Sequence, residues 1–152
     1  MSNQQPSATA DNNRYFNEYA SGIGYLNSVR EFGDDGKLSR VSVQISVIQG
    51  SSDQIHYEYH DLIVPNEKVR SVILNHRGAI EDNDVNVVIC FKMVNPRAKA
   101  FTYKHGDRAG ELGTAIGGIL TRVLSLKLNG ELVYEDDAQR ESKQATRQVA
   151  NG

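Results

Sequence analysis

The chain of 152 residues contains one cysteine, Cys90, and no tryptophan. A single cysteine excludes an internal disulfide framework and a cysteine-based zinc cage. No apolar run approaches the roughly 20 residues of a membrane-spanning helix. The polar residues 1–13 do not have the pattern of a signal or transit peptide. We therefore expect a cytoplasmic protein that has no contact with the membrane.

Positive charge is not in excess either. The chain has 17 Lys and Arg residues and 19 Asp and Glu residues, which gives a net charge of −2. This net charge produces no long-range attraction to nucleic acid. Residues 1–13 and 136–152 hold few large apolar side chains, so we expect two disordered tails. Residues 14–135 then form one domain, which is long enough to bury a core.

Apolar residues with a period of two dominate this domain. Val41, Val43, Ile45 and Val47 alternate with polar residues, which is typical of a half-buried strand. The same period predicts strands at residues 22–32, 55–60, 85–94, 120–128 and 131–134.

Two of these strands carry further predictions about burial. Phe91 shares its face with Ile89 and Met93, which assigns it to the core. Along residues 120–128 the alternation groups Leu120, Leu124, Leu126 and Leu128 on one face, opposite Thr121, Val123, Ser125 and Lys127. Turns are predicted at residues 33–36 and at Asn129-Gly130, the preferred pair for a two-residue hairpin.

One segment has the period of a helix. Asn66 is a good N-cap and Glu67 suits a helix start. The residues that share one helical face after it are Val69, Val72, Ile73, His76 and Ile80. Three strands, one helix and two further strands is the element order of the OB-fold. We predict a mainly β, five- to six-stranded OB-fold-like barrel with one helix between strands 3 and 4; a β-sandwich is the alternative.

No catalytic constellation is recognisable. The chain has no P-loop and no dinucleotide-binding fingerprint. His56 and His60 are four residues apart, which in a strand is about 13 Å and too far for one metal ion. We interpret them as solvated strand residues, Cys90 as an inert apolar residue and His76 as a core histidine. We therefore expect neither an enzyme nor a bound cofactor or metal.

Residues 91–108 combine positive charge with aromatic rings. These eighteen residues contain five cations and one acid, Asp107. Asn95-Pro96 predicts a turn that joins residues 85–94 and 99–104 in a hairpin with a basic tip. Cations that follow phosphates and rings that stack on bases are what single-stranded nucleic acid requires.

The candidate nucleic-acid-binding residues of this hairpin are Lys92, Arg97, Lys99, Phe101, Tyr103, Lys104 and Arg108. Tyr25, Tyr57 and Tyr59 are further stacking candidates, although only one face of their strands can point outward. The ordinary alternative is that the lysines keep a sheet edge soluble and the rings pack inward.

Five glycines lie in residues 105–118, which predicts a mobile excursion after the hairpin. It is either a flexible connection or a loop that becomes ordered around a bound strand.

Four short motifs resemble a family of small bacterial proteins: residues 14–16, 22–27, 101–104 and 130–134. That family comprises replication proteins of integrative and conjugative elements, many of which carry only a domain-of-unknown-function label. The resemblance implies a role in the replication of a mobile element. A more distant resemblance is to bacterial single-stranded-DNA-binding proteins, but this chain lacks tryptophan and their acidic C-terminal tip. Partner recruitment through such a tip is therefore not implied.

The resulting hypothesis is a non-enzymatic single-stranded-DNA-binding protein of a mobile element. Its expected partners are single-stranded DNA, replication proteins of the element and further copies of itself. Residues 22–32 or 57–64 are candidate sheet edges for pairing across a two-fold axis. The alternative is a protein-interaction module of the same element that does not touch nucleic acid.

Overall fold

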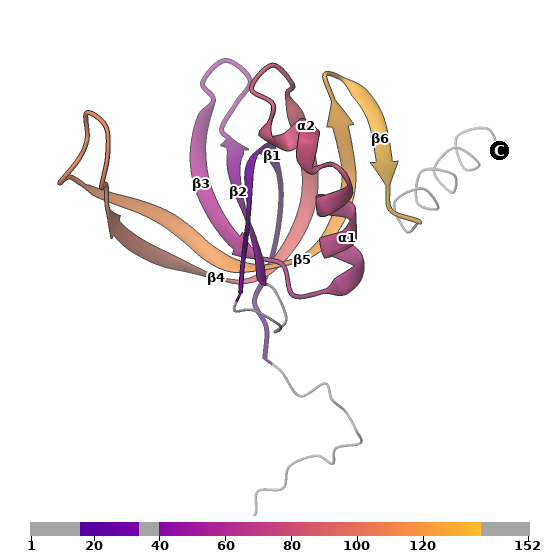
Figure 1. Ribbon diagram of the computed structural model, residues 1–152, viewed down its shortest axis with the longest axis horizontal. Coiled ribbons are helices and arrows are strands. Elements are labelled where there is room, and N and C mark those ends of the chain that lie inside the picture. Colours follow the sequence, from indigo (N-terminus) through magenta and orange to yellow (C-terminus); the bar gives the residue numbers. More distant parts are fainter. Residues whose placement is uncertain (1–15, 34–39, 138–152) are drawn as a thin grey trace, which may run out of the picture.

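Six strands and two short helices make up the computed structural model, which describes residues 16–33 and 40–137 (Figure 1). In chain order they are β1 (Tyr19–Phe32), β2 (Arg40–Gln49), β3 (His56–Ile63), α1 (Glu67–Asn75), α2 (Arg77–Glu81), β4 (Val87–Thr102), β5 (Leu112–Leu128) and β6 (Glu131–Glu135). The predicted tail at residues 1–13, the predicted tail at residues 136–152 apart from Asp136 and Asp137, and the predicted turn from Asp34 onward lie outside the described residues.

The strands form one sheet in the order β3-β2-β1-β4-β5-β6. A parallel pairing of β3 with β5, from His60 opposite Ile116 to Ile63 opposite Ile119, closes the first five strands into a barrel. This strand order and closure are those of the OB-fold, so the predicted architecture is confirmed and the sandwich is wrong. β6 is a sixth strand that extends the sheet beyond β5.

Closure covers the predicted sheet edges only in part, because β3 pairs with β5 over residues 60–63 and β1 pairs with β4 over residues 19–25. β1 pairs with both β2 and β4, and β3 pairs with both β2 and β5. Residues 26–32 of β1 and 57–59 of β3 therefore keep one side without a strand partner, and the pairing of these segments across a two-fold axis stays a prediction. Among the described strands, β6 is the one that pairs with a single neighbouring strand.

The core fills the barrel. Val41, Val43, Ile45 and Val47 are all buried, as their alternation predicts, and Phe91 is fully enclosed. β5 departs from its predicted alternation, because Leu120, Val123 and Leu126 are the buried residues and Leu124 is only half-buried. Register shifts opposite Phe91 and Met93 cause this difference, since each bulge turns the following side chains to the other face.

The helical segment consists of two helices rather than the single one predicted. Asn66 caps α1 as expected, because its side chain accepts a hydrogen bond from the Val69 amide at 3.1 Å. The chain leaves helical geometry at His76, whose Nδ1 donates to the Val72 carbonyl at 2.9 Å. α2 then begins, and Ile73 and Ile80 both remain buried in the core. The predicted core role of His76 holds in part, because the ring is half-buried.

β4 and β5 continue past the barrel as a long two-stranded projection beside β3 (Figure 1). We call it the arm: residues 97–102 of β4, residues 112–117 of β5 and the connection 103–111. The register runs from Arg97 opposite Gly117 to Thr102 opposite Leu112. Residues 112–118 are thus strand, and the prediction of a mobile excursion was wrong for them.

The predicted hairpin between residues 85–94 and 99–104 was also wrong, because residues 87–94 and 99–102 belong to the same strand, β4. Asn95 and Pro96 form a bulge in this strand instead of a turn. Asn95 has a φ of 58°, and its amide donates to the Glu18 carbonyl at 2.7 Å. Its Oδ1 accepts from the Glu18 amide at 2.9 Å. The bulge satisfies its polar groups at the start of β1, so the strand can continue into the arm.

Candidate nucleic-acid interface

One face of the arm carries its large polar and aromatic side chains. Residues that pair across a sheet share a face, so Arg97, Lys99 and Phe101 lie on the side of Gly117, Ala115 and Gly113. A Cβ atom at Gly117 would lie 2.6 Å from Lys99 Cδ, and one at Gly113 would lie 2.6 Å from Phe101 Cζ. The long side chains of β4 therefore lie directly over the backbone of β5.

Two rings meet near the end of the arm. The centroids of Phe101 and Tyr103 are 5.0 Å apart, at an interplanar angle of 68°. Arg108 covers Tyr103, with its Cζ 4.4 Å from the ring centroid, and donates to the Tyr103 hydroxyl at 3.1 Å. Phe101 remains 42% exposed. Phe101 is thus the ring available for stacking. Tyr103, which Arg108 covers, packs edge-on against Phe101.

An ion pair joins this face to the barrel. Lys99 Nζ lies 3.1 Å from Asp61 Oδ2 on β3. The neighbours of Asp61 in sequence, His60 and Leu62, point into the barrel, so Asp61 points outward with Tyr57 and Tyr59. The arm–β3 surface, as we name it, consists of Arg97, Lys99, Phe101, Tyr103, Tyr57, Tyr59 and Asp61.

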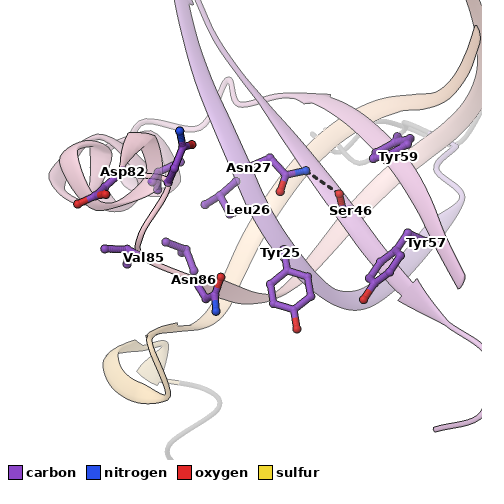
Figure 2. Close-up of a pocket in the computed structure, with 12 residues that line it drawn as sticks. Tyr25, Leu26, Asn27, Ser46, Tyr57, Tyr59, Asp82, Val85 and Asn86 are labelled. Atoms are coloured by element: carbon purple, nitrogen blue, oxygen red, sulfur yellow. Dashed lines mark hydrogen bonds between the residues drawn. The ribbon is translucent and has the colours of Figure 1, made fainter. Parts of the chain in front are cut away.

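The exposure of the tyrosines shows which face of β3 points outward. Tyr57 and Tyr59 are each 49% exposed. Tyr25 on β1 lies near Tyr57, at a centroid distance of 6.2 Å (Figure 2). Ser46 lies in register between Tyr25 and Tyr59, and its Oγ accepts from Asn27 Nδ2 at 2.6 Å. Three aromatic rings therefore occupy the outside of β1 and β3.

A cavity of about 420 Å³ adjoins these rings. Tyr25, Asn27 and Tyr57 line one side, and residues 82–83 and 85–87, between α2 and the start of β4, line the other (Figure 2). Asp82 is the one charged residue among those that line it. The cavity suits a flat polar group better than a phosphate, because a carboxylate repels an anion.

The five predicted cations are not all brought together. Arg97, Lys99, Lys104 and Arg108 lie on the arm, and Lys92 lies on the barrel part of β4, opposite Arg122. Two of the arm cations have acidic partners: Lys99 pairs with Asp61, and Arg108 Nε lies 3.5 Å from Glu111 Oε1. Within the described residues, Arg97 and Lys104 are exposed and form no ion pair.

The prediction that His56 and His60 are both solvated is wrong for His60. Its ring is buried, with 9% exposed, and meets Phe91 edge-on at a centroid distance of 6.3 Å. This burial lowers the pKa of His60, although the nearby Glu58 carbonyl and carboxylate oppose the change. His56 is exposed as predicted, and its Nε2 lies 3.1 Å from Gln49 Oε1.

Metal-ligating side chains and long apolar helices were both considered in residues 16–33 and 40–137. In these ranges, no three metal-ligating side chains come together as a metal site would require. None of the helices there has the length and apolar character needed to cross a membrane.

Sequence reasoning missed Asp61, which is 38 residues away from Lys99 and has no local pattern that connects the two. It also missed that β5 begins at Leu112. A usable pattern was present there, because Gly113, Ala115 and Gly117 are small residues at a period of two, opposite the long side chains of β4. Small residues at every second position are expected where long side chains of one strand lie over the backbone of its neighbour.

The closed barrel and its surface define the class: an OB-fold protein with aromatic and basic side chains on the outside of β3 and the arm. The chain belongs to the family described as a protein of unknown function (DUF3577), whose model matches residues 9–142. No curated protein matches the sequence.

The solved structures that are similar to this chain include two of single-stranded-DNA-binding proteins. The mitochondrial single-stranded DNA binding protein Rim1 of S. cerevisiae is 14% identical, with 80% of this chain and 100% of that chain covered and a TM-score of 0.37. The small single-stranded DNA-binding protein of Streptomyces coelicolor is 11% identical, with 80% and 96% covered and a TM-score of 0.41.

Proposed function

We propose that this protein is a non-enzymatic single-stranded-DNA-binding protein and that the DNA lies on the arm–β3 surface. The observation that supports this most is the shared face of three exposed rings, Phe101, Tyr57 and Tyr59, with the cations of the arm. In OB-folds, the face of strands 2 and 3 and the connection between strands 4 and 5 are common sites for oligonucleotides. Both elements contribute to this surface.

Each part of the surface has a role in this proposal. Bases stack on Phe101, Tyr57 and Tyr59, and Tyr25 extends the row of rings. Phosphates contact Arg97, Lys99, Lys104 and Arg108. Stacking and charge do not read base edges, so sequence preference is weak. Four phosphate contacts on a single strand give a slope of log K against log salt of about −3.

The cellular context is part of the proposal. The motifs that resemble replication proteins of integrative and conjugative elements favour a role in the replication or transfer of such an element, in the cytoplasm. Self-association is a further component, because small barrels bind long strands more tightly when several copies act together. Light scattering on the purified protein measures the number of copies.

The second candidate is a protein-interaction module of the same element. The other face of the arm favours it, because Ala98, Ala100 and Thr102 are uncharged and exposed, and Leu112 is 69% exposed. The net charge of −2 also does not attract DNA from a distance. This candidate predicts indifference to nucleic acid.

Fluorescence anisotropy with a labelled single strand of roughly 30–40 nucleotides distinguishes the two candidates. At low salt we expect saturable binding, with competition by unlabelled single strands and much weaker competition by duplex of the same sequence. An RNA competitor of the same sequence tests the preference for DNA. If the full chain does not bind the single strand at low salt, the proposed function is wrong.

A further inference from the structure

Lys92 does not belong to the arm, yet it lines a cavity of its own. The cavity has a volume of about 550 Å³ and lies on the outside of β1, β4 and β5. The residues that line it are Tyr19, Ala20, Ser21, Lys92, Thr121 and Arg122. We call it the Lys92 cavity.

The charges in this cavity are of one sign. Lys92 and Arg122 are directly opposite each other in the register of β4 and β5, an arrangement that is unfavourable for like charges unless an anion lies between them. The Arg122 guanidinium donates twice to Asp136 Oδ2, at 2.8 and 3.1 Å, which offsets part of its charge. Lys92 is exposed and forms no ion pair within the described part of the chain. No carboxylate lines the cavity.

Tyr19 adds an aromatic ring to this site. The residue is 75% exposed, and its ring stacks on no other ring within residues 16–33 and 40–137. Two cations, Lys92 and Arg122, therefore line the same cavity as Ser21 and the exposed ring of Tyr19. Cations that hold a phosphate beside a ring that stacks on a base match the chemistry of one nucleotide of a single strand.

The outer face of the barrel connects this cavity to the tyrosines. Tyr59, Ser46, Tyr25 and Val88 lie in one row across β3, β2, β1 and β4. Ser21, which is four residues before Tyr25 in β1, lies opposite Lys92. Four residues of a strand span about 13 Å, so the cavity lies within the reach of a strand that covers the tyrosines.

We propose that the Lys92 cavity is a second contact for the same single strand. A phosphate lies between Lys92 and Arg122, and a base stacks on Tyr19. The strand then leaves the arm–β3 surface, crosses the outside of β1 and ends at the Lys92 cavity. This proposal rests on the proposed function, and it adds Tyr19 and Arg122 as binding residues.

The test compares four variants of the full chain: Lys92→Gln and Tyr19→Leu in the cavity, Phe101→Leu on the arm, and Lys68→Gln on α1 as a control. Lys68 is an exposed lysine that lines a neighbouring cavity. That cavity shares Thr121 and Arg122 with the Lys92 cavity but is also lined by Asp136 and Asp137, whose carboxylates repel a phosphate on the side of Lys68. Binding of a single strand of roughly 30–40 nucleotides is measured against salt. Thermal unfolding confirms that each variant is folded.

We expect Lys92→Gln to make the slope of log K against log salt less negative by about 0.7, the loss of one phosphate contact. Tyr19→Leu should weaken binding by between about 5-fold and about 150-fold without changing the slope. Photo-crosslinking of a strand that carries a halogenated uracil, followed by mass spectrometry, should identify the peptide that contains Tyr19.

Two results overturn the inference, and they differ. If Lys92→Gln and Tyr19→Leu bind like Lys68→Gln while Phe101→Leu is weakened, the strand does not reach the cavity and the proposed function stands. If the unaltered chain does not bind single-stranded DNA, both the proposed function and the inference are wrong.

Discussion

Lys99 Nζ on the arm lies 3.1 Å from Asp61 Oδ2 on β3, and this contact joins the two halves of the arm–β3 surface. Both side chains are partly exposed, so water screens the pair and its contribution to stability is below about 1 kcal/mol. Its consequence for binding is larger, because Asp61 neutralises a cation where phosphates are proposed to lie.

Asp61→Asn should therefore tighten the binding of single-stranded DNA. The substitution removes one repelling charge and releases Lys99 for a phosphate, a change of about 1 kcal/mol or fivefold in affinity. Anisotropy at low salt measures it, and Glu67→Gln on α1 is the control for the loss of an acid elsewhere. Equal affinities for Asp61→Asn and Glu67→Gln would exclude Lys99 as a phosphate contact.

Phe101→Ala should weaken DNA binding by about 1–3 kcal/mol, because one base loses its stacking partner. The domain should keep its stability, since the ring is 42% exposed. Leu132→Ala on β6 is a matched truncation, because Leu132 is 46% exposed and lies away from the arm. The stacking role is wrong if both variants bind with the affinity of the unaltered chain.

Two glycines should respond differently to the same methyl group. At Gly24 a Cβ atom would collide with the backbone carbonyl of Ser46, which β-sheet pairing holds in place. Gly24→Ala should reduce the free energy of unfolding by about 1–3 kcal/mol in urea. At Gly113 the Cβ would meet the rings of Phe101 and Tyr103, which can rotate away.

Gly113→Ala should accordingly unfold at nearly the same urea concentration as the unaltered chain and bind DNA more weakly. The pair of variants separates the stability of the barrel from the geometry of the arm. A large loss of stability in Gly113→Ala would show that the rings support the fold and are not free to serve a ligand.

His60 should make stability depend on pH. Burial holds its pKa below the ordinary value of a histidine. Between that lowered pKa and the ordinary value of about 6.5, the unfolded chain binds a proton that the folded chain does not. The free energy of unfolding should therefore fall as the pH decreases below about 6.5, and this contribution stops changing below the pKa of the folded state.

Urea unfolding between about pH 7.5 and about pH 5 measures this slope. His60→Gln should have a flatter profile, and His56→Gln is the control substitution at an exposed histidine. If the profiles of the unaltered chain and His60→Gln are parallel, the buried imidazole does not account for the pH dependence.

The periodicity of the sequence was enough to predict the element order and much of the core. Alternation identified β2 correctly, and the N-cap at Asn66 located the start of α1 within one residue. It failed at the Asn95-Pro96 pair, where a turn was predicted and β4 continues. The hydrogen bonds that make the bulge possible come from Glu18, 77 residues away, and local patterns do not contain them.

By itself, the sequence determined the kind of fold, because the period of apolar residues decides whether a segment buries its face as a strand or as a helix. It also determined which segment is rich in cations and rings. The tertiary structure alone decided which of these side chains act together. Strand pairing sets which face of β3 is outward, brings Asp61 to Lys99, and separates Lys92 from the arm. Such contacts depend on register between strands that are distant in sequence, and a shift of one residue would reverse every face.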